Sequence, residues 1–152
     1  MFRRDARTVG MSLRKEFAFP ADLHSLGVYR EQAMQFVREY CHDPADEIDL
    51  TVALQEALAN AILHGCRSDA GQVIHCAIEI EPSNVTIVVR DPGSGFDFER
   101  VADPKRFDPT TLARGRGIAL MRALVDEVSY SRRGSEVRLS KRMNCGAASP
   151  AL

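Results

Sequence analysis

Two alternating apolar runs, joined by a very short connection, constrain the fold of this chain more than any other feature. The runs are VIHCAIEIE at 73–81 and NVTIVVRD at 84–91, and only Pro82 and Ser83 separate them. Runs rich in Val and Ile with a period of two predict strands, and a two-residue connection predicts an antiparallel hairpin. The sequence therefore predicts that this hairpin forms the middle of a sheet.

The remaining patterns supply a layer of helices and further strands. Residues 12–19 alternate and end at Pro20, which predicts a first strand at an edge or an interface. A last hairpin over 127–143 turns at Gly134. Apolar residues at three- and four-residue steps predict helices over 22–42, 46–65 and 117–125. This order predicts an α+β fold, a two-layer α/β sandwich whose mixed, mostly antiparallel sheet is covered by helices on one face.

Length and charge limit the class of protein. A chain of 152 residues with 45% hydrophobic residues fits one domain, expected over 12–143 after a flexible leader (1–11) and before a disordered tail (144–152). The formal net charge of -1 gives no overall field that would recruit nucleic acid or an anionic membrane. We therefore expect a partner to be recognised by a local site.

The cysteines carry a prediction about the cellular compartment. Cys41, Cys66, Cys76 and Cys145 form no C-x-x-C pair and no cluster with zinc-ligand spacing. No signal peptide or long apolar segment is visible in the sequence. We therefore expect a reducing cytoplasm and free thiols that act as small buried hydrophobes.

A polar stripe runs along the helix predicted over 46–65. In the stretch EALANAILHG, Glu56, Asn60 and His64 stand four residues apart among alanines and leucines. A solvated helix flank is one interpretation of such a trio. The other is a cleft wall, because an amide oxygen can ligate Mg²⁺ and a carboxylate can orient or deprotonate a nucleophile.

The stretch RDPGSGFD follows directly after an apolar strand. Asp91 could accept a hydrogen bond from an exocyclic amine, and Gly93 and Gly95 would let the backbone pass close to a planar ligand. A plain turn is the alternative, since D-P-G is a common turn tripeptide. The chain does not return to the sheet after the turn, which favours a ligand site, and the long irregular segment that follows is either functional or disordered.

A third stretch, RGRGIALM, places a Gly-x-Gly at the predicted start of a helix. Free backbone N–H groups of Gly115 and Gly117 would form an anion site, to which Arg114 and Arg116 would add charge. The alternative is close helix packing beside two solvated arginines. The pattern is not the P-loop form.

Taken in order, the three stretches resemble a known superfamily. E-x-x-x-N-x-x-x-H-G on a helix, D-x-G-x-G after a strand and G-x-G at a helix start resemble the N, G1 and G2 boxes of the GHKL ATPases, which have the Bergerat fold. The short chain looks most like bacterial anti-sigma factor serine/threonine-protein kinases. The resemblance covers residues 12–143.

The resemblance implies a role for several of these residues. It implies that Asn60 ligates Mg²⁺ and that Glu56 is the general base. Asp91 would bind the adenine amine of ATP, and Gly95 would let the base approach. Gly115 and Gly117 would receive phosphate.

The resemblance also implies a lid over residues 98–114. The lid cannot be aligned residue by residue, so the resemblance does not say which of Arg100, Lys105 and Arg106 would contact the γ-phosphate. His64 matches the family pattern, with a helix-end contact as the alternative to a role in the site.

The function implied is a cytoplasmic kinase that phosphorylates an anti-sigma factor antagonist and sequesters a sigma factor. The second hypothesis is an ATP-gated protein-binding module without kinase turnover. A histidine kinase would need a phospho-accepting histidine on a dimerising helix, and His24 lacks the coiled-coil pattern around it. An adaptor that binds no nucleotide is the last alternative. Relatives commonly dimerise, and residues 12–19 are the expected contact in a homodimer.

Overall fold

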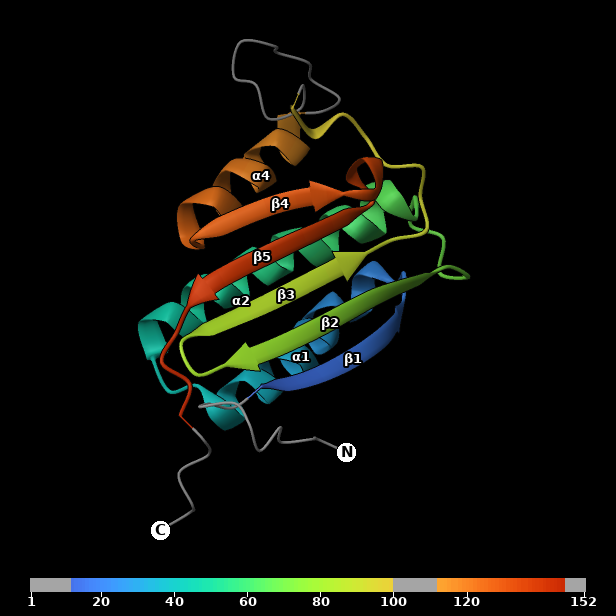
Figure 1. Ribbon diagram of the computed structural model, residues 1–152. Coiled ribbons are helices and arrows are strands. Elements are labelled where there is room, and N and C mark those ends of the chain that lie inside the picture. The colour runs from blue at the N-terminus through green and yellow to red at the C-terminus, as the bar shows by residue number, and fades with distance from the viewer. Residues whose placement is uncertain (1–11, 100–111, 147–152) are drawn as a thin grey trace.

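One antiparallel sheet forms the frame of the molecule (Figure 1). The computed structural model describes residues 12–99 and 112–146, and of residues 112–114 only the backbone. The strands are β1 (Leu13–Pro20), β2 (Val73–Glu81), β3 (Asn84–Arg90), β4 (Glu127–Ser131) and β5 (Glu136–Arg142). Their order across the sheet is β1-β2-β3-β5-β4, and all neighbours among the described strands are antiparallel. The predicted central hairpin is confirmed, and β1 lies at an edge.

Three helices cover one face of this sheet, as Figure 1 shows. They are α1 (Leu26–Tyr40), α2 (Pro44–Asn60) and α4 (Leu112–Leu124), and the short turns are η1 (Leu23–Ser25), η2 (Ala61–Gly65) and η3 (Arg132–Gly134). The predicted α+β two-layer sandwich is confirmed. None of the helices in the described ranges combines the length and the apolar character that crossing a bilayer requires.

One aspartate caps the start of α2, and another caps the short turn that precedes α1. Asp43 accepts a hydrogen bond from the N–H of Asp46 at 3.3 Å, and Pro44 follows it in the first turn of α2. Asp22 instead closes the short turn η1, because its carboxylate accepts from the N–H of His24 and the hydroxyl of Ser25. The predicted helix over 22–42 is therefore shorter, and α1 begins at Leu26.

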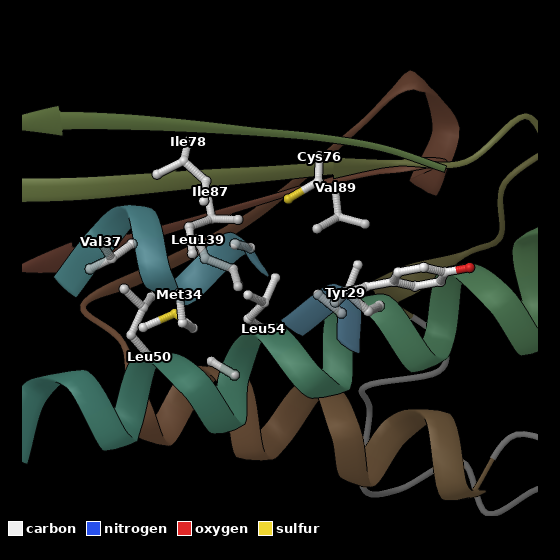
Figure 2. Packing of buried hydrophobic residues seen from close by; sticks show 14 of the residues in the cluster. Tyr29, Met34, Val37, Leu50, Leu54, Cys76, Ile78, Ile87, Val89 and Leu139 are labelled. Carbon is white, nitrogen blue, oxygen red and sulfur yellow. The ribbon is translucent and has the colours of Figure 1, made fainter. Parts of the chain in front are cut away.

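The core lies between the helices and the sheet (Figure 2). Fully buried side chains from both layers meet there: Met34, Val37, Leu50 and Leu54 from the helices, and Ile78, Ile87 and Leu139 from the strands. Burial of such side chains is the main favourable contribution to folding. The packing holds α2 across the sheet, with its last turn near the end of β3.

A buried lysine ties two helices to β5. The Nζ atom of Lys141 donates to the carbonyl of Leu124, the last residue of α4, at 2.9 Å. The same atom lies 3.5 Å from Asp46 and 3.8 Å from Asp49 in α2. The side chain is only 10% exposed, so these partners offset the cost of burying its charge.

The prediction of four free thiols was wrong for two of them. Cys41 and Cys145 form a disulfide, with 4.1 Å between their Cα atoms, although 104 positions separate them in the sequence. The backbones of these two residues pair, and the N–H of Cys145 donates to Pro82 at 2.9 Å. This three-way contact places Cys145 in the ordered fold, so the predicted disordered tail starts too early at 144. Cys66 and Cys76 are free and buried, as predicted.

Other predictions fall outside the described residues. These are the leader 1–11, the tail beyond 146, and most of the lid, including Arg100, Lys105 and Arg106.

Candidate functional site

Glu56, Asn60 and Gly117 come together where α2 and α4 pack. A Cβ atom at Gly117 would lie 2.9 Å from Oε2 of Glu56 and 3.4 Å from Nδ2 of Asn60. A larger residue at this position would therefore displace the Glu56 carboxylate. Close helix packing, one of the two interpretations of this glycine, is confirmed, and it brings three of the predicted site residues into one place.

The amide of Asn60 has an unmet hydrogen bond. Its Nδ2 atom is buried and finds no partner among the described residues. Leaving a buried donor unpaired costs about 1–3 kcal/mol, so such a group in a folded protein calls for an explanation. A ligand that accepts this hydrogen bond would supply one.

Asp91 is fixed against the end of η2. Its Oδ1 atom accepts a hydrogen bond from the N–H of Gly93 at 2.8 Å, the geometry of the plain turn that was one alternative. A Cβ atom at Gly65 would lie 2.1 Å from Cγ of Asp91, and one at Gly93 would lie 2.5 Å from the carbonyl oxygen of Gly65. Both glycines are therefore needed for the Asp91 carboxylate to reach this position.

This contact explains the glycine at position 65. A glycine at a helix end is often a left-handed C-cap, but the positive φ angles in this turn occur at Arg67 and Ser68. Gly65 is required because Asp91 packs on it, a contact between residues far apart in the chain.

The predicted helix also changes character in its last turn. Residues of η2 form a π-helical turn, in which the N–H of Cys66 donates to the carbonyl of Ala61 at 2.8 Å. This wider turn breaks the four-residue repeat that joined His64 to Asn60. His64 instead lines a cavity beside Asp91.

Asp91 lines three cavities, of which two also border η2 or α2. The larger, of about 630 Å³, lies between η2 and residues 91–95, within the size range of small-molecule sites. The smaller, of about 20 Å³, joins Asn60 to Asp91 beneath α2. We place the candidate site around the smaller one, since it connects the predicted polar residues.

Cys66 also lines the larger cavity but is a poor nucleophile. Burial raises the pKa of its thiol, and the negative charges of Asp91 and Asp69 raise this pKa further.

Gly95 is held by the turn between β4 and β5. Its φ is 83°, and a Cβ atom would lie 2.0 Å from the carbonyl oxygen of Arg133. The same oxygen accepts a hydrogen bond from the N–H of Phe96 at 2.9 Å. The structure therefore requires glycine here for backbone packing, and approach of a base to Gly95 stays a prediction.

The helix with the Gly-x-Gly begins earlier than predicted. α4 starts at Leu112, so Gly115 and Gly117 lie inside it and do not open it. Leucine and alanine at 112 and 113 are strong helix formers that extend the helix upstream. The side chain of Arg116 is exposed. Phosphate binding by this segment, and a role for Arg114, stay predictions.

Three residues of the smaller cavity were missed in the sequence: Phe96, Tyr130 and Ser135. Phe96 directly follows the D-x-G-x-G pattern, which was a usable signal. Tyr130 has the spacing of an ordinary core position in a strand, and nothing in the sequence separates it from one.

Comparisons with known proteins identify the family of this chain. Residues 19–141 match the family described as Histidine kinase-like ATPase domain. An anti-sigma F factor of Clostridium botulinum (strain Eklund 17B) is 35% identical over 109 residues, which cover 67% of this chain and 76% of that relative. An anti-sigma F factor of Clostridium perfringens (strain SM101) is 28% identical over 141 residues, covering 88% of this chain and 99% of the relative.

A solved structure shows the same fold. It contains the RsbU and RsbW domains of a Mycobacterium tuberculosis protein, and it matches this chain with a TM-score of 0.54 at 22% identity. The match covers 86% of this chain and 32% of the solved chain. From the family match and the two relatives, the chain belongs to the histidine kinase-like ATPase domain family, in the group that includes the anti-sigma F factors.

Proposed function

We propose that this chain is a cytoplasmic, ATP-dependent protein-serine/threonine kinase of the anti-sigma factor type. It would phosphorylate an anti-sigma factor antagonist and sequester a sigma factor. The family match supports ATP binding. The relatives are anti-sigma F factors, which supports a sigma factor as the partner. The antagonist comes from the resemblance of the sequence to kinases of this type.

One observation carries the proposal. Asn60, with its unpartnered Nδ2 atom, lines the smaller cavity together with Asp91, and it lies with Glu56 against Gly117. Asp91 would accept the adenine amine, and Glu56 would orient or deprotonate the hydroxyl of the antagonist. Positioning of this kind is what phosphoryl transfer chiefly requires of a protein.

The residues present fit a bound Mg²⁺. No group of three His, Cys, Asp or Glu side chains that could hold a metal occurs in residues 12–99 and 112–146. Mg²⁺ in nucleotide sites is held by one or two protein oxygens, with phosphates and waters as the other ligands. The amide oxygen of Asn60 can be such a ligand, with the Glu56 carboxylate beside it. When bound, Mg²⁺ would neutralise phosphate charge.

A homodimer is part of the proposal. β1 pairs with β2 along one side only, so its other side is an open sheet edge in the described part of the chain. Open edges are surfaces on which a second chain can pair.

Two measurements test the kinase proposal. We expect ATP with Mg²⁺ to raise the melting temperature, and labelled ATP to transfer its label to a cognate antagonist. Glu56→Gln should retain ATP binding and lose the transfer. Glu39→Gln, an exposed change on α1, is the matched control and should retain both.

The outcomes separate the alternatives. ATP binding without label on the antagonist would reject the kinase and favour the ATP-gated module. If ATP with Mg²⁺ leaves the melting temperature unchanged, the adaptor that binds no nucleotide is favoured.

A further inference from the structure

Three aromatic rings pack against one another beside the smaller cavity. We call Phe96, Phe98 and Tyr130 the aromatic wall. The rings of Phe98 and Tyr130 stack with 5.0 Å between centroids, and Phe96 meets Tyr130 edge-on at 5.4 Å. Both arrangements are favourable for aromatic pairs. Phe96 and Tyr130 line the cavity itself, together with Asn60 and Asp91.

The backbone holds the wall in place. Tyr130 lies on β4 directly opposite Val137 of β5. Phe96 is fixed to the turn between these strands by its N–H, which donates to Arg133 at 2.9 Å. A Cβ atom at Gly134 would lie 2.5 Å from the carbonyl oxygen of Phe96, so the two segments are in close contact. Tyr130 is therefore part of the folded sheet, and Phe96 is held beside it by the turn between β4 and β5.

The cavity lining has the chemistry of a site for a flat heteroaromatic ring. Apolar groups make up most of it, contributed by Ala57, Ala61, Val89, Val137 and the two aromatic residues. The polar groups are Asn60, Asp91 and Ser135. Apolar walls with a few convergent polar groups are typical of sites for small organic ligands. The carboxylate of Asp91 disfavours phosphate at this end.

The cavity is too small for a nucleobase unless side chains of its lining move. At about 20 Å³ it is smaller than a nucleobase, so a bound base must displace side chains of the lining. The backbone is constrained by the contacts of Gly65, Gly95 and Gly134. The half-buried rings of Phe96 and Tyr130 are the large side chains that border the space.

We propose that Tyr130 is a specificity-determining residue for the nucleotide base. With Phe96 it contacts a purine that presents its exocyclic amine to Asp91, and a pyrimidine is too small to reach both. This inference rests on the proposed function, because it assigns a wall to the ATP site proposed there.

Titration calorimetry with ATP and CTP tests the proposal. Aromatic contact with a base is worth about tenfold in affinity, so Tyr130→Leu should weaken ATP binding about tenfold. CTP binding should change little, and the preference for ATP over CTP should fall. Tyr40→Leu is the matched control, since Tyr40 also makes an edge-on aromatic contact, with Phe36, away from the cavity.

The ratio of the two affinities distinguishes specificity from a loss of folded protein, which lowers both equally. An unchanged ratio in Tyr130→Leu would overturn the proposal and leave the proposed ATP binding intact. If the unmutated protein binds neither nucleotide, the proposed function fails instead.

A second variant avoids the risk of misfolding. The chain has three tyrosines and no tryptophan, so tyrosine dominates its fluorescence. Tyr130→Phe keeps the ring, and it should remove an ATP-dependent change in tyrosine fluorescence that the unmutated protein shows. If the variant retains this change, Tyr130 does not contact the base.

Discussion

The two ends of the sheet differ in whether their residues are strained and unpaired or are joined by stabilising bonds. At the site end, where β3 leads into Asp91, Asn60 has a buried donor without a partner in the described residues, and Arg132 and Arg133 have positive φ. At the opposite end, where β2 turns into β3, the Cys41–Cys145 disulfide ties three segments together.

The difference shows how the fold divides stability and function. Left-handed backbone and an unmet hydrogen bond cost free energy, and such features persist only where the surrounding structure determines them. The capped start of α2 and the buried Lys141 stabilise the other end. We call the end with the disulfide the tied end and expect changes there to alter stability alone. Changes at the site end should alter both stability and ATP binding.

The disulfide gives the largest expected effect. Cys145→Ser should lower the free energy of unfolding by about 4 kcal/mol, because the bond closes a long loop in the unfolded chain. Urea unfolding measures this loss, and ATP affinity should not change. A reducing agent should destabilise the unmutated protein by a similar amount and leave Cys145→Ser unaffected. A clear loss of ATP affinity would show that the two ends are coupled.

Gly95→Ala tests the site end. The change places a side chain at positive φ and against the carbonyl of Arg133, and should cost about 3 kcal/mol. Because the same loop carries Asp91, we also expect weaker ATP binding in calorimetry. Gly146→Ala is the control, since nothing lies within 4 Å of a Cβ atom there. Equal stability of the two variants would contradict the packing described for Gly95.

Lys141→Met tests how much the buried lysine contributes to stability at the tied end. The variant keeps the volume of the side chain but leaves the carbonyl of Leu124 without its charged donor, and should cost about 2 kcal/mol. Urea unfolding measures the loss. Arg138→Met, on the exposed face of the same strand, should change stability little. A neutral Lys141→Met would show that its ion pairs with α2 contribute nothing net.

Arg133→Gly should change the free energy of unfolding least of the four variants, and it should raise stability where the others lower it. Arg133 has φ 57° and ψ 32°, a conformation that costs an L-residue free energy and that glycine adopts readily. Thermal unfolding should show a gain of about 1 kcal/mol. Arg138→Gly, in an extended strand, should show a loss. Lower stability of Arg133→Gly would mean that the arginine side chain contributes more than the strained backbone costs.

Local pattern was enough for most of the secondary structure. The hairpin over 73–91 and the first two helices follow from apolar period, turn residues and caps, which act over a few neighbouring residues. The polar residues Glu56, Asn60 and Asp91 could be found in the same way, because their types and spacings are visible along the chain.

Two features that the sequence analysis did not find have one cause. The π-helical turn at η2 and the role of Gly65 are not visible in the pattern of the local sequence. For Gly65 the deciding contact is the carboxylate of Asp91, and for Gly95 it is the carbonyl of Arg133. A glycine in a sequence shows that no side chain is present, and only packing shows which atoms need the space.

The sequence by itself thus determined the class of fold, the middle of the sheet and the identity of the polar residues, since periodicity and residue chemistry are local properties. Tertiary structure alone decided that Cys41 bonds to Cys145 and that Tyr130 joins Phe96 and Phe98 beside Asn60. The physical reason is that these contacts join residues far apart in the chain, and their geometry depends on how the helices and strands pack.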